Sequence, residues 1–479
     1  MYIGLDLGTS GLKALLIDDA QRVIDEATAP LDVQRLHPGW SEQRPADWVT
    51  ATTAAMDALA SRQSLAAVRG IGLSGHMHGA TLLDRADNVL RPCILWNDTR
   101  AHLEAAALDM DPCFRAISGN IVFPGFTAPK LVWVRENEPD IFARTARVLL
   151  PKDYLRLWLT GEAVSDPSDA AGTSWLDTGA RDWSADLLAA CDLDRSQMPA
   201  LVEGSAPSGT LRAGLATMWG LRSDVIVAGG AGDNAASAIG VGAVRAGQAF
   251  VSLGTSGVLF AACDSYSPAP ESSVHTFCHA MPATWHQMGV ILSATDSLNW
   301  YARLIGQDAA ALTRALGPLQ APGRALFLPY LGGERTPHND ATVRGALTGL
   351  EHATDTSAGT RAVLEGVAHA LRDNLDALAA TGTRIDSLIA VGGGSRSDYW
   401  VHAIATALDL PVDLPEAGDF GAALGAARLG MMAATGAGAD IATAPRIART
   451  VAPDATLQTA FADAHARYCH TYTALKDLS

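Results

Sequence analysis

Charged side chains, and basic clusters in particular, are scarce in this chain. Charged residues make up 18% of the 479 positions, below the usual share of about a quarter, so long disordered segments are not expected. The 51 Asp and Glu residues outnumber the 35 Lys and Arg residues, which gives a net charge of −16. Proteins that bind nucleic acid normally carry a basic stripe. We therefore expect no nucleic acid among the partners.

Cysteines and long apolar runs are also scarce. The 6 cysteines form no C-x-x-C pair and show none of the spacings of a zinc site. Reduced thiols in a cytoplasmic protein are the simplest interpretation. No apolar run approaches the roughly 18 residues that a membrane-spanning helix needs, and the first residues lack the basic and apolar regions of a signal peptide. These absences predict a cytoplasmic protein with no membrane partner.

Two common catalytic signatures are missing as well. The chain has no Walker A pattern, which excludes the P-loop class of nucleotide-binding enzymes. It has no G-x-S-x-G elbow, so hydrolysis by a Ser-His-Asp triad has no support. An anionic substrate would have to be held by backbone amides or a metal ion, since the overall charge is acidic.

Glycine, by contrast, is abundant with 45 residues, and one glycine-rich motif occurs twice. Leu7–Gly11 reads LGTSG, and the same five letters return at Leu253–Gly257. Each copy stands between two apolar runs, which predicts a β-hairpin with a phosphate-sized turn. The repeat predicts two similar halves, which we divide into domains 1–243 and 244–479.

Strand and helix patterns alternate along the chain and indicate an α/β fold. Val68–Ser74 reads as a buried strand, and Ala80–Asp84 is expected to be its partner. Apolar residues at helical spacing predict a helix over Pro45–Arg62. Further helices are expected over Thr360–Ala380 and over the small-residue segment Phe420–Ala434.

The first candidate site is Asp6–Lys13, which holds the first LGTSG copy. Glycines allow a ligand to approach closely, while the hydroxyls of Thr9 and Ser10 and successive backbone N–H groups can bind a phosphate. Asp6, at the end of a strand, is suited to holding Mg²⁺ through water. An ordinary hairpin turn would fit the same residues. In the second copy Ser252 takes the place of Asp6, so only one loop carries a metal-directing carboxylate.

Two further glycine clusters each join a strand to a helix. Gly229–Asn234 presents Asp233, which could act as the base in phosphoryl transfer or as the N-cap of the helix. Gly392–Asp398 contains three successive glycines. They would permit close approach of a nucleotide base or ribose, although a tight turn between strand and helix requires the same residues.

Two polar segments have the composition of sugar contacts. His76-Met77-His78 lacks the third and fourth ligand of a metal site, so hydrogen bonding to a polyol and a satisfied loop histidine are the two interpretations. Trp96–Arg100 combines an aromatic ring with amide, acid and guanidinium groups. This is typical of a sugar contact and equally of a helix start.

In this order the motifs resemble the FGGY carbohydrate kinases of the actin-like ATPase superfamily. Gly125–Asn137 is similar to the first signature of that family. Asp6–Lys13, Ser252–Gly257 and Gly392–Asp398 resemble its phosphate-1, phosphate-2 and adenosine motifs. The resemblance implies an α/β fold of two actin-like (ribonuclease H-like) ATPase domains flanking a cleft. The sugar, the phosphate-1 loop and the catalytic Asp would belong to the first domain, and the other two motifs to the second.

The resemblance also implies roles for individual residues. Asp233 would be the catalytic base. The other implied roles are sugar binding by Met77, His78, Trp96, Asp233 and Asn234; nucleotide binding by Thr9, Ser10, Lys13, Gly254, Thr255, Gly393, Gly394 and Asp398; and Mg²⁺ binding, through water, by Asp6 and Asp233.

Four segments are typical of family members that act on D-xylulose: Ser74–Gly79, Leu95–Asp98, Leu150–Tyr154 and Gly333–Asn339. The expected reaction is therefore ATP- and Mg²⁺-dependent phosphorylation of D-xylulose on O5. Ribulose, 1-deoxy-xylulose and glycerol are the alternative substrates. An actin-like chaperone or filament ATPase and a non-catalytic sugar sensor are more remote alternatives. The partners would be a ketopentose and ATP, and a homodimer would be consistent with this family.

Overall fold

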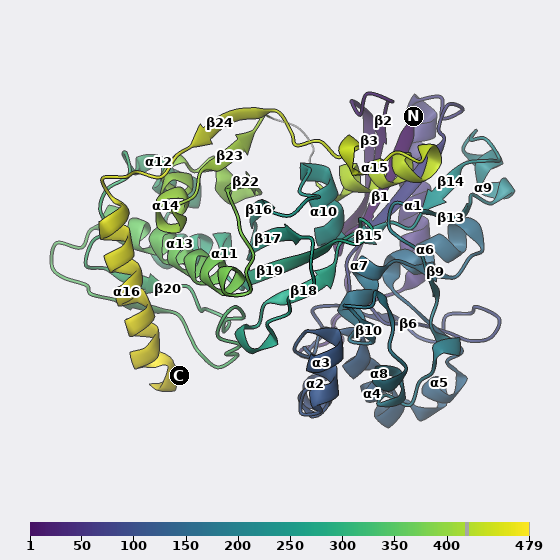
Figure 1. The fold of residues 1–479 in the computed structure, drawn as a ribbon, viewed down its shortest axis with the longest axis horizontal. Helices are drawn as coiled ribbons and strands as arrows, with labels where there is room; N and C mark the ends of the chain where they lie inside the picture. The colour runs from purple at the N-terminus through teal and green to yellow at the C-terminus, as the bar shows by residue number, and fades with distance from the viewer. Residues whose placement is uncertain (417–420, 479) are drawn as a thin grey trace.

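Two sheets, one from each half of the chain, organise the molecule (Figure 1). The structure is a computed structural model that describes residues 1–416 and 421–478. Within these residues each large sheet has seven strands. The first sheet consists of β13 (Pro207–Thr210), β14 (Ile226–Ala228), β5 (Gly70–Gly75), β1 (Tyr2–Leu7), β2 (Gly11–Ile17) and β3 (Val23–Pro30) in that order, with β15 (Ala231–Gly232) beside β5. The second consists of β18 (His275–Cys278), β19 (Trp285–Ile291), β17 (Gly257–Cys263), β16 (Gln248–Leu253), β22 (Ser387–Val391), β23 (Val412–Pro415) and β24 (Ile447–Val451).

The two sheets share one pairing pattern. Each begins with an antiparallel hairpin across an LGTSG turn, β1 with β2 and β16 with β17. In each, the first strand of the hairpin also pairs in parallel with a later strand, β5 or β22, which pairs in parallel with β14 or β23. The last strand of each series, β13 or β24, is antiparallel. The repeated topology confirms the prediction of two similar halves.

Helices cover the sheets and fill the connections. The α-helices of the first half are α1 (Pro45–Arg62), α2 (His102–Asp109), α3 (Pro112–Ser118), α4 (Thr127–Asn137), α5 (Pro139–Arg144), α6 (Pro151–Thr160), α7 (Pro167–Ala170), α8 (Ala185–Ala189), α9 (Ala213–Met218) and α10 (Asp233–Val241). Those of the second half are α11 (Thr295–Leu304), α12 (Ala309–Ala315), α13 (Thr356–Ala380), α14 (Asp398–Leu408), α15 (Ala422–Thr435) and α16 (Gln458–Leu475). Short two-stranded ladders join β4 (Glu42–Gln43) to β7 (Cys93–Ile94), β6 (Thr81–Leu83) to β8 (Arg147–Leu149), β9 (Val164–Ser165) to β12 (Ala200–Leu201), β10 (Leu176–Asp177) to β11 (Asp182–Trp183) and β20 (Leu326–Leu328) to β21 (Ala346–Thr348).

Most local expectations are confirmed, and one strand pairing was wrong. Helix α1 has the predicted bounds, and its apolar face is buried. The segment after β5 was expected to return as its partner, but β6 pairs antiparallel with β8 instead. The turn between β5 and β6 carries the chain out of the first sheet, and β5 is already paired on both sides by β1 and β14. The expected helix from Phe420 begins at Ala422; Phe420 lies outside the described residues.

Helix α15 belongs to the second half of the sequence but packs on the first sheet (Figure 1). Small residues allow the helix and the strands to approach closely. A Cβ atom added to Gly72 of β5 would lie 1.8 Å from the carbonyl oxygen of Ala426, and one added to Gly4 of β1 would lie 1.9 Å from that of Ala423. On its other side α15 packs against α10, where Gly425 meets the backbone of Ala236. Helix α15 therefore fixes α10 over the first sheet.

The halves are also joined along the neighbouring strands β18 and β19 of the second sheet. The side chain of Asn120 accepts a hydrogen bond from the backbone N–H of Thr276 at 2.9 Å and donates one to its carbonyl oxygen at 2.9 Å. The carbonyl oxygen of Thr178 accepts the indole N–H of Trp285 at 2.8 Å. These contacts, of which the Asn120 pair is buried, join the two halves.

Two further sequence expectations concern membranes and thiols. In the part of the chain that the structure describes, no helix is both long and apolar enough to span a bilayer. All 6 cysteines are free thiols, as expected.

Candidate active site

Three parallel strands of the first sheet end at a common edge. Asp6 of β1 is in register with Ser74 of β5, and Ser74 is in register with Ala231 of β15. Gly232 ends β15, so Asp233 follows it at the same edge as Asp6. The register explains how two carboxylates more than two hundred positions apart in the sequence come to interact.

Asp233 is the first residue of helix α10, and its environment disfavours the ionised form. Burial and the neighbouring negative charge of Asp6 raise the pKa of the Asp233 carboxyl to about 6. Its Oδ1 accepts hydrogen bonds from the backbone N–H of Asn234 at 2.7 Å and from the Asn234 side chain at 3.0 Å. The N-cap interpretation of Asp233 was wrong, because the N-cap position is taken by Gly232.

The turn that carries Asp233 is held by close backbone packing. Gly230 has a φ of 74°, a left-handed conformation that favours glycine. A Cβ atom there would lie 2.3 Å from the carbonyl oxygen of Leu73. The guanidinium of Arg156 donates a hydrogen bond to the carbonyl oxygen of Gly229. The backbone N–H of Gly232 donates to the hydroxyl of Ser168 at 3.3 Å.

Arg156 and Ser168 belong to a fully buried charge cluster behind this turn. The Nζ atom of Lys152 lies 2.6, 2.7 and 3.1 Å from carboxylate oxygens of Asp153, Asp166 and Asp169. Arg156 also contacts Asp153 at 2.6 Å. Three acids surround two bases, and burial with these like charges raises the pKa of Asp169 well above its ordinary value. The cluster supports the turn of Asp233 through hydrogen bonds rather than through apolar packing.

The first LGTSG turn lies beside Trp96. The backbone N–H of Gly8 closes the turn on the carbonyl oxygen of Gly11 at 2.9 Å. The indole N–H of Trp96 donates to Oγ1 of Thr9 at 2.9 Å, while Ser10 is exposed. The ammonium group of Lys13 lies 2.8 Å from the Glu26 carboxylate on β3. The structure thus brings together one residue predicted for the sugar and one predicted for the nucleotide.

The second LGTSG turn is anchored by the start of α11. Backbone N–H groups of Ala294 and Thr295 donate to the carbonyl oxygens of Thr255 and Gly254 at 2.8 and 2.9 Å. The side chain of Thr295 also donates to Gly254 at 2.8 Å. These bonds leave the Thr255 side chain exposed. The turn is therefore held by hydrogen bonds to its carbonyl oxygens, while the side chain of Thr255 remains accessible to a ligand.

The third glycine cluster packs directly on the second LGTSG turn. Gly392 has a φ of 90°, and a Cβ atom there would lie 2.7 Å from the carbonyl oxygen of Leu253. A Cβ atom on Gly394 would lie 2.8 Å from the Leu253 side chain, whereas one on Gly393 would meet nothing within 4 Å. Gly392 and Gly393 are both exposed, whereas Gly394 is buried against Leu253.

A cavity of about 830 Å³ separates α10 from the second sheet. Asn234 and Ser237 of α10 line one side, and Ser252 and Gly392 line the other. Asp398, the first residue of α14, also lines it, and its carboxylate is held by Arg449 at 2.5 Å. Polar groups of both halves thus meet around a space of the size that small-molecule ligands occupy.

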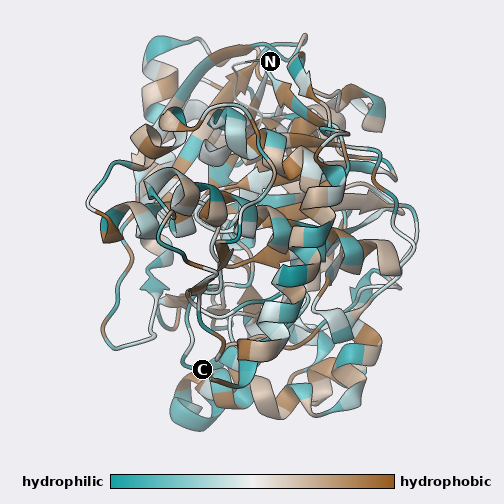
Figure 2. Cartoon of the chain, turned by 90° about the vertical axis from the view of Figure 1, so that its left-hand side faces the viewer, coloured by the Kyte–Doolittle hydropathy of each residue, from teal (hydrophilic) through white to brown (hydrophobic). Residues whose placement is uncertain are grey.

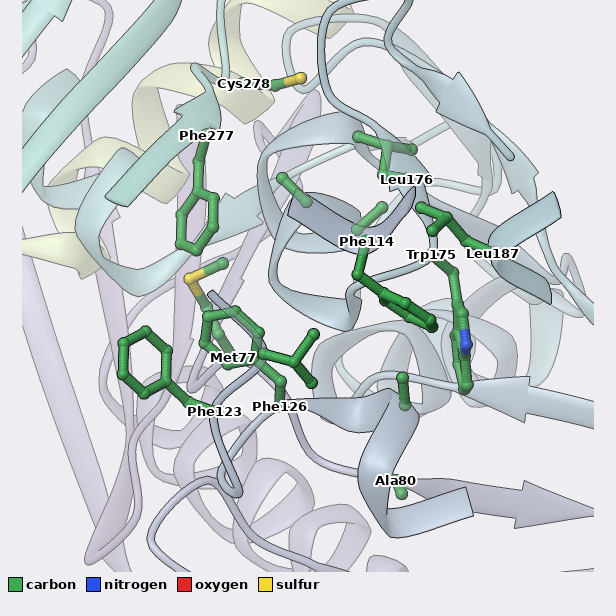
Figure 3. Packing of buried hydrophobic residues seen from close by; sticks show 14 of the residues in the cluster. Met77, Ala80, Phe114, Phe123, Phe126, Trp175, Leu176, Leu187, Phe277 and Cys278 are labelled. Atoms are coloured by element: carbon green, nitrogen blue, oxygen red, sulfur yellow. The ribbon is translucent and has the colours of Figure 1, made fainter. Parts of the chain in front are cut away.

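Met77 lies among the aromatic side chains of Phe123, Phe126 and Phe277 (Figure 3), and the neighbouring His78 contacts the rings of Phe126 and Phe277. Met77 is only 5% exposed, and its side chain lies beneath Gly232, where an added Cβ would be 2.8 Å from Met77 Cγ. Nδ1 of His78 lies 2.6 Å from the carbonyl oxygen of Gly172, and its ring stacks on Phe126 at 4.5 Å. Burial lowers the pKa of His78 to about 3, so its imidazole is neutral at physiological pH.

Several neighbours of His78 received no role from the sequence. Phe277 of β18 points toward Met77 and Phe126 (Figure 3), and the guanidinium of Arg335 lies over the ring of Phe123 at 4.4 Å. Lys130 of α4 is fully buried, and its ammonium donates to the carbonyl oxygen of His78 at 2.8 Å. Lys130, Phe126 and Arg335 lie inside the family-typical segments 125–137 and 333–339, so those segments were the signal that could have identified them.

Residues 1–240 match the family model described as the N-terminal domain of the FGGY family of carbohydrate kinases, and residues 249–434 match its C-terminal domain. The chain belongs to the FGGY family of carbohydrate kinases. Like the rest of this family, the FGGY kinase phosphorylates a sugar with ATP and Mg²⁺, and it has the two-domain actin-like ATPase fold.

Individual relatives are similar over most of their length. The xylulose kinase of Escherichia coli (strain K12) is 51% identical over 437 residues, which cover 91% of this FGGY kinase and 90% of the relative. The xylulose kinase of Bacillus subtilis (strain 168) is 36% identical over 444 residues, which cover 91% of this FGGY kinase and 88% of the relative. A crystal structure described as a "xyloylose kinase" from Brucella ovis is 65% identical, with a TM-score of 0.99 and complete coverage of both chains.

Proposed function

We propose that this FGGY kinase transfers the γ-phosphoryl group of ATP to O5 of D-xylulose, which yields D-xylulose 5-phosphate and ADP. The observation that carries the proposal is Asp233, a carboxylate of raised pKa beside the cavity between the halves. Relatives that are half identical over nine-tenths of the chain are named xylulose kinases, which supports this sugar.

Asp233 would act as the general base. Its carboxylate accepts the proton of the O5 hydroxyl while O5 attacks the γ-phosphorus, and the bond between that phosphorus and the bridging oxygen of ADP breaks. A pKa of about 6 leaves the carboxylate ionised at neutral pH and more basic than an ordinary aspartate. Asn234 would fix the orientation of Asp233 through the two hydrogen bonds to Oδ1.

Asp6 and Asp233 would hold Mg²⁺ through water. The negative charge of Asp6 raises the pKa of Asp233, so the two carboxylates are near enough for a cation beside them to relieve their repulsion. The donor set of carboxylate oxygens and water is the one that Mg²⁺ prefers. When bound, the ion would neutralise charge on the phosphate oxygens of ATP.

The nucleotide would occupy the cavity that Ser252, Gly392 and Asp398 line. Gly393 and Gly394 would face the adenosine, and the Gly254–Thr255 and Thr9–Ser10 turns would bind the phosphates from the two halves. Lys13, which is held by Glu26, would add positive charge to the first turn. Asp398 would shape the cavity wall together with Arg449.

The sugar would lie between Asp233 and His78. Met77 and the ring stack of His78 on Phe126 would form an apolar surface beneath the carbons, and Asn234 and Trp96 would contact its hydroxyls. Because His78 is neutral, it can donate or accept a hydrogen bond without adding charge to the site.

We also propose the remaining properties that the sequence predicted. The cytoplasm is the proposed location, because ATP is the second substrate and the 6 cysteines are free. A homodimer is the proposed assembly, and neither nucleic acid nor membrane is proposed as a partner of a chain with a charge of −16. Residues 1–243 and 244–479 are the proposed domains, with α15 returning to pack on the first sheet.

A substrate panel combined with one variant tests this function. ADP release is measured with D-xylulose, ribulose, 1-deoxy-xylulose and glycerol, and D-xylulose should give the highest kcat/KM. Asp233→Ala should lose sugar phosphorylation by about a thousandfold or more, as expected for a base and its orientation, while ATP binding and thermal unfolding persist. Near-normal turnover of Asp233→Ala would show that Asp233 is not the base. A higher kcat/KM for another sugar would contradict the assignment of D-xylulose as the substrate.

A further inference from the structure

A cluster of histidine, cysteine and aspartate side chains lies in the second half, outside the cavity and the LGTSG turns. Asp373 comes from α13, and His465 and Cys469 come from α16, one helical turn apart. The Nε2 atom of His465 lies 2.7 Å from Oδ1 of Asp373 and 3.5 Å from Sγ of Cys469, and Sγ lies 3.6 Å from the same Oδ1. Three different metal-ligating atoms therefore lie within a few ångströms of one another.

These three distances are close to the separations between three ligand atoms of a tetrahedral zinc ion. With bonds of about 2.0 Å to nitrogen and oxygen and about 2.3 Å to sulfur, the ligand atoms of tetrahedral zinc are about 3.3–3.6 Å apart. Only the separation of 2.7 Å between His465 and Asp373 is shorter, because a hydrogen bond now joins the two atoms. Small side-chain movements would open that edge to the required length.

His338 lies next to this group of three and is the candidate for a fourth ligand. It lies in the segment between β20 and β21, its Nε2 is 3.9 Å from Oδ2 of Asp373, and its ring stacks on Tyr472 of α16 at 3.7 Å. The hydroxyl of Tyr330 lies 3.2 Å from the same nitrogen. A third chain segment thus presents an imidazole toward the shared carboxylate.

We propose that Asp373, His465, Cys469 and His338 form a binding site for a zinc ion. The combination of thiolate, imidazole and carboxylate is the donor set of zinc, whereas Mg²⁺ and Ca²⁺ take oxygen ligands. His465 and Cys469 are spaced i and i+4, so that they share one face of α16. The site is separate from the Mg²⁺ of the kinase reaction in both residues and ligand chemistry.

The surroundings are compatible with the entry of an ion. The side chains of Asp373, His338 and His465 are 11%, 16% and 19% exposed, so water reaches the cluster. His465 also lines a cavity of about 310 Å³ between α14 and α16. The nearest cation on α13, Arg372, is engaged with Asp376 at 2.8 Å.

A nucleophilic cysteine site is the competing interpretation, and the geometry argues against it. In a Cys-His-Asp arrangement the thiol and the carboxylate contact opposite nitrogens of the imidazole, so that one nitrogen takes the proton while the other is oriented. Here both groups contact the same nitrogen, Nε2 of His465. Convergence on one point is what a metal ion requires.

Zinc at this place would connect three parts of the second half. Helix α16 lies on the outer face of the molecule, where it leads to the C terminus (Figure 2). The ion would tie α16 to α13 and to the segment that also carries Arg335. We expect it to stabilise the second half without taking part in phosphoryl transfer, because Asp233 lies at the edge of the first sheet.

Zinc binding to the full-length enzyme tests the proposal. Protein stripped of metal with a chelator is titrated with ZnCl₂ against a competing chromophoric chelator, and then with CoCl₂. We expect one equivalent of zinc, and for cobalt the thiolate charge-transfer band and strong visible bands of a tetrahedral site. Cys469→Ser should abolish the charge-transfer band, and His465→Ala should weaken zinc binding at least tenfold, while Cys113→Ser, a partly exposed free cysteine elsewhere, should change neither.

Failure of the zinc proposal can be distinguished from failure of the proposed kinase function. Turnover of D-xylulose should stay within about twofold in Cys469→Ser, since the residue touches no part of the reaction, and zinc should raise the unfolding temperature of the wild type but not of this variant. Both variants are first checked for wild-type circular dichroism, and Cys469→Ala replaces Cys469→Ser if that variant is unfolded. Absence of stoichiometric zinc, or equal binding by the folded cysteine variant, would overturn the proposal.

Discussion

The indole N–H of Trp96 donates a hydrogen bond to the hydroxyl oxygen of Thr9 at 2.9 Å. Trp96 was predicted to contact the sugar and Thr9 the nucleotide, so this bond links the two proposed binding regions directly. Trp96 is 47% exposed, and its ring is therefore available to a substrate. A ligand on either side that orders this pair would favour binding on the other side.

The bond predicts a paired loss of affinity for the two substrates. Thr9→Val removes the acceptor, and Trp96→Phe removes the donor while keeping an aromatic ring. Each should raise KM for both D-xylulose and ATP by about fivefold, as the loss of roughly 1 kcal/mol would. Thr9→Ser keeps the hydroxyl and should behave like the wild type. A change in only one KM would show that the bond does not couple the substrates.

The raised pKa of Asp233 predicts an acid limb in the activity profile. Since the carboxyl takes up its proton at a pH near 6, the fraction of ionised base falls below that pH, and kcat/KM for the sugar should fall with it by about tenfold per pH unit. Carboxyl resonances of ¹³C-labelled free enzyme should titrate accordingly. Asp6→Asn should lower the pKa of Asp233, because it removes the like charge. An unchanged pKa of Asp233 in this variant would show that the charge of Asp6 does not affect it.

The same shift predicts that Asp233→Asn stabilises the fold. A carboxyl whose folded pKa lies above its unfolded value favours folding at low pH, and that contribution is lost as the pH rises from about 4 to about 6. The neutral amide avoids the penalty, so the gain at pH 7 should be roughly 1–3 kcal/mol and should disappear near pH 4. Urea unfolding at both pH values measures it. Asp224→Asn, a replacement at an exposed position, is the control. An equal gain in the free energy of unfolding of Asp233→Asn at both pH values would contradict the raised pKa of Asp233.

The buried cluster behind Asp233 predicts a large cost for losing its lysine. Lys152→Met leaves three carboxylates without the ammonium between them and should lower the free energy of unfolding by about 3–5 kcal/mol. Because the cluster supports the Asp233 turn, kcat should fall more than the affinity for ATP. Lys476→Met at an exposed position should leave both unchanged. Unaltered urea unfolding of Lys152→Met would show that the cluster has no supporting role.

The packing of α15 on the first sheet predicts opposite effects for two glycine replacements. In Gly72→Ala the new methyl group would overlap the backbone of Ala426, so the helix must move away from β5, at a cost of about 3 kcal/mol or more. In Gly214→Ala nothing lies within 4 Å of the new methyl group, and the gain in a helix should be about 0.4–1 kcal/mol. Thermal unfolding distinguishes them; equal stability of both variants would contradict the packing.

Local features were predictable where neighbouring residues determine the structure. Both LGTSG hairpins and helix α1 formed as expected, because apolar periodicity and glycine turns act within a few residues. The pairing of β6 was not predictable in this way, since the choice of β8 over β5 depends on which strand edges are already occupied. The alternative interpretation of Asp233 as an N-cap failed because a shift of one residue in the turn separates the N-cap from the first helical position.

The sequence by itself determined the two-fold α/β plan, the glycine turns and, through its motifs, the FGGY kinase family. Tertiary structure alone decided that Asp6 and Asp233 share a sheet edge, that α15 returns to the first sheet, and that Trp96 meets Thr9. It also placed Asp373 beside His465 and Cys469, although the cysteine spacing shows no zinc signature. Contacts between distant residues depend on strand register and helix packing, which are properties of the whole fold and leave little trace in local sequence.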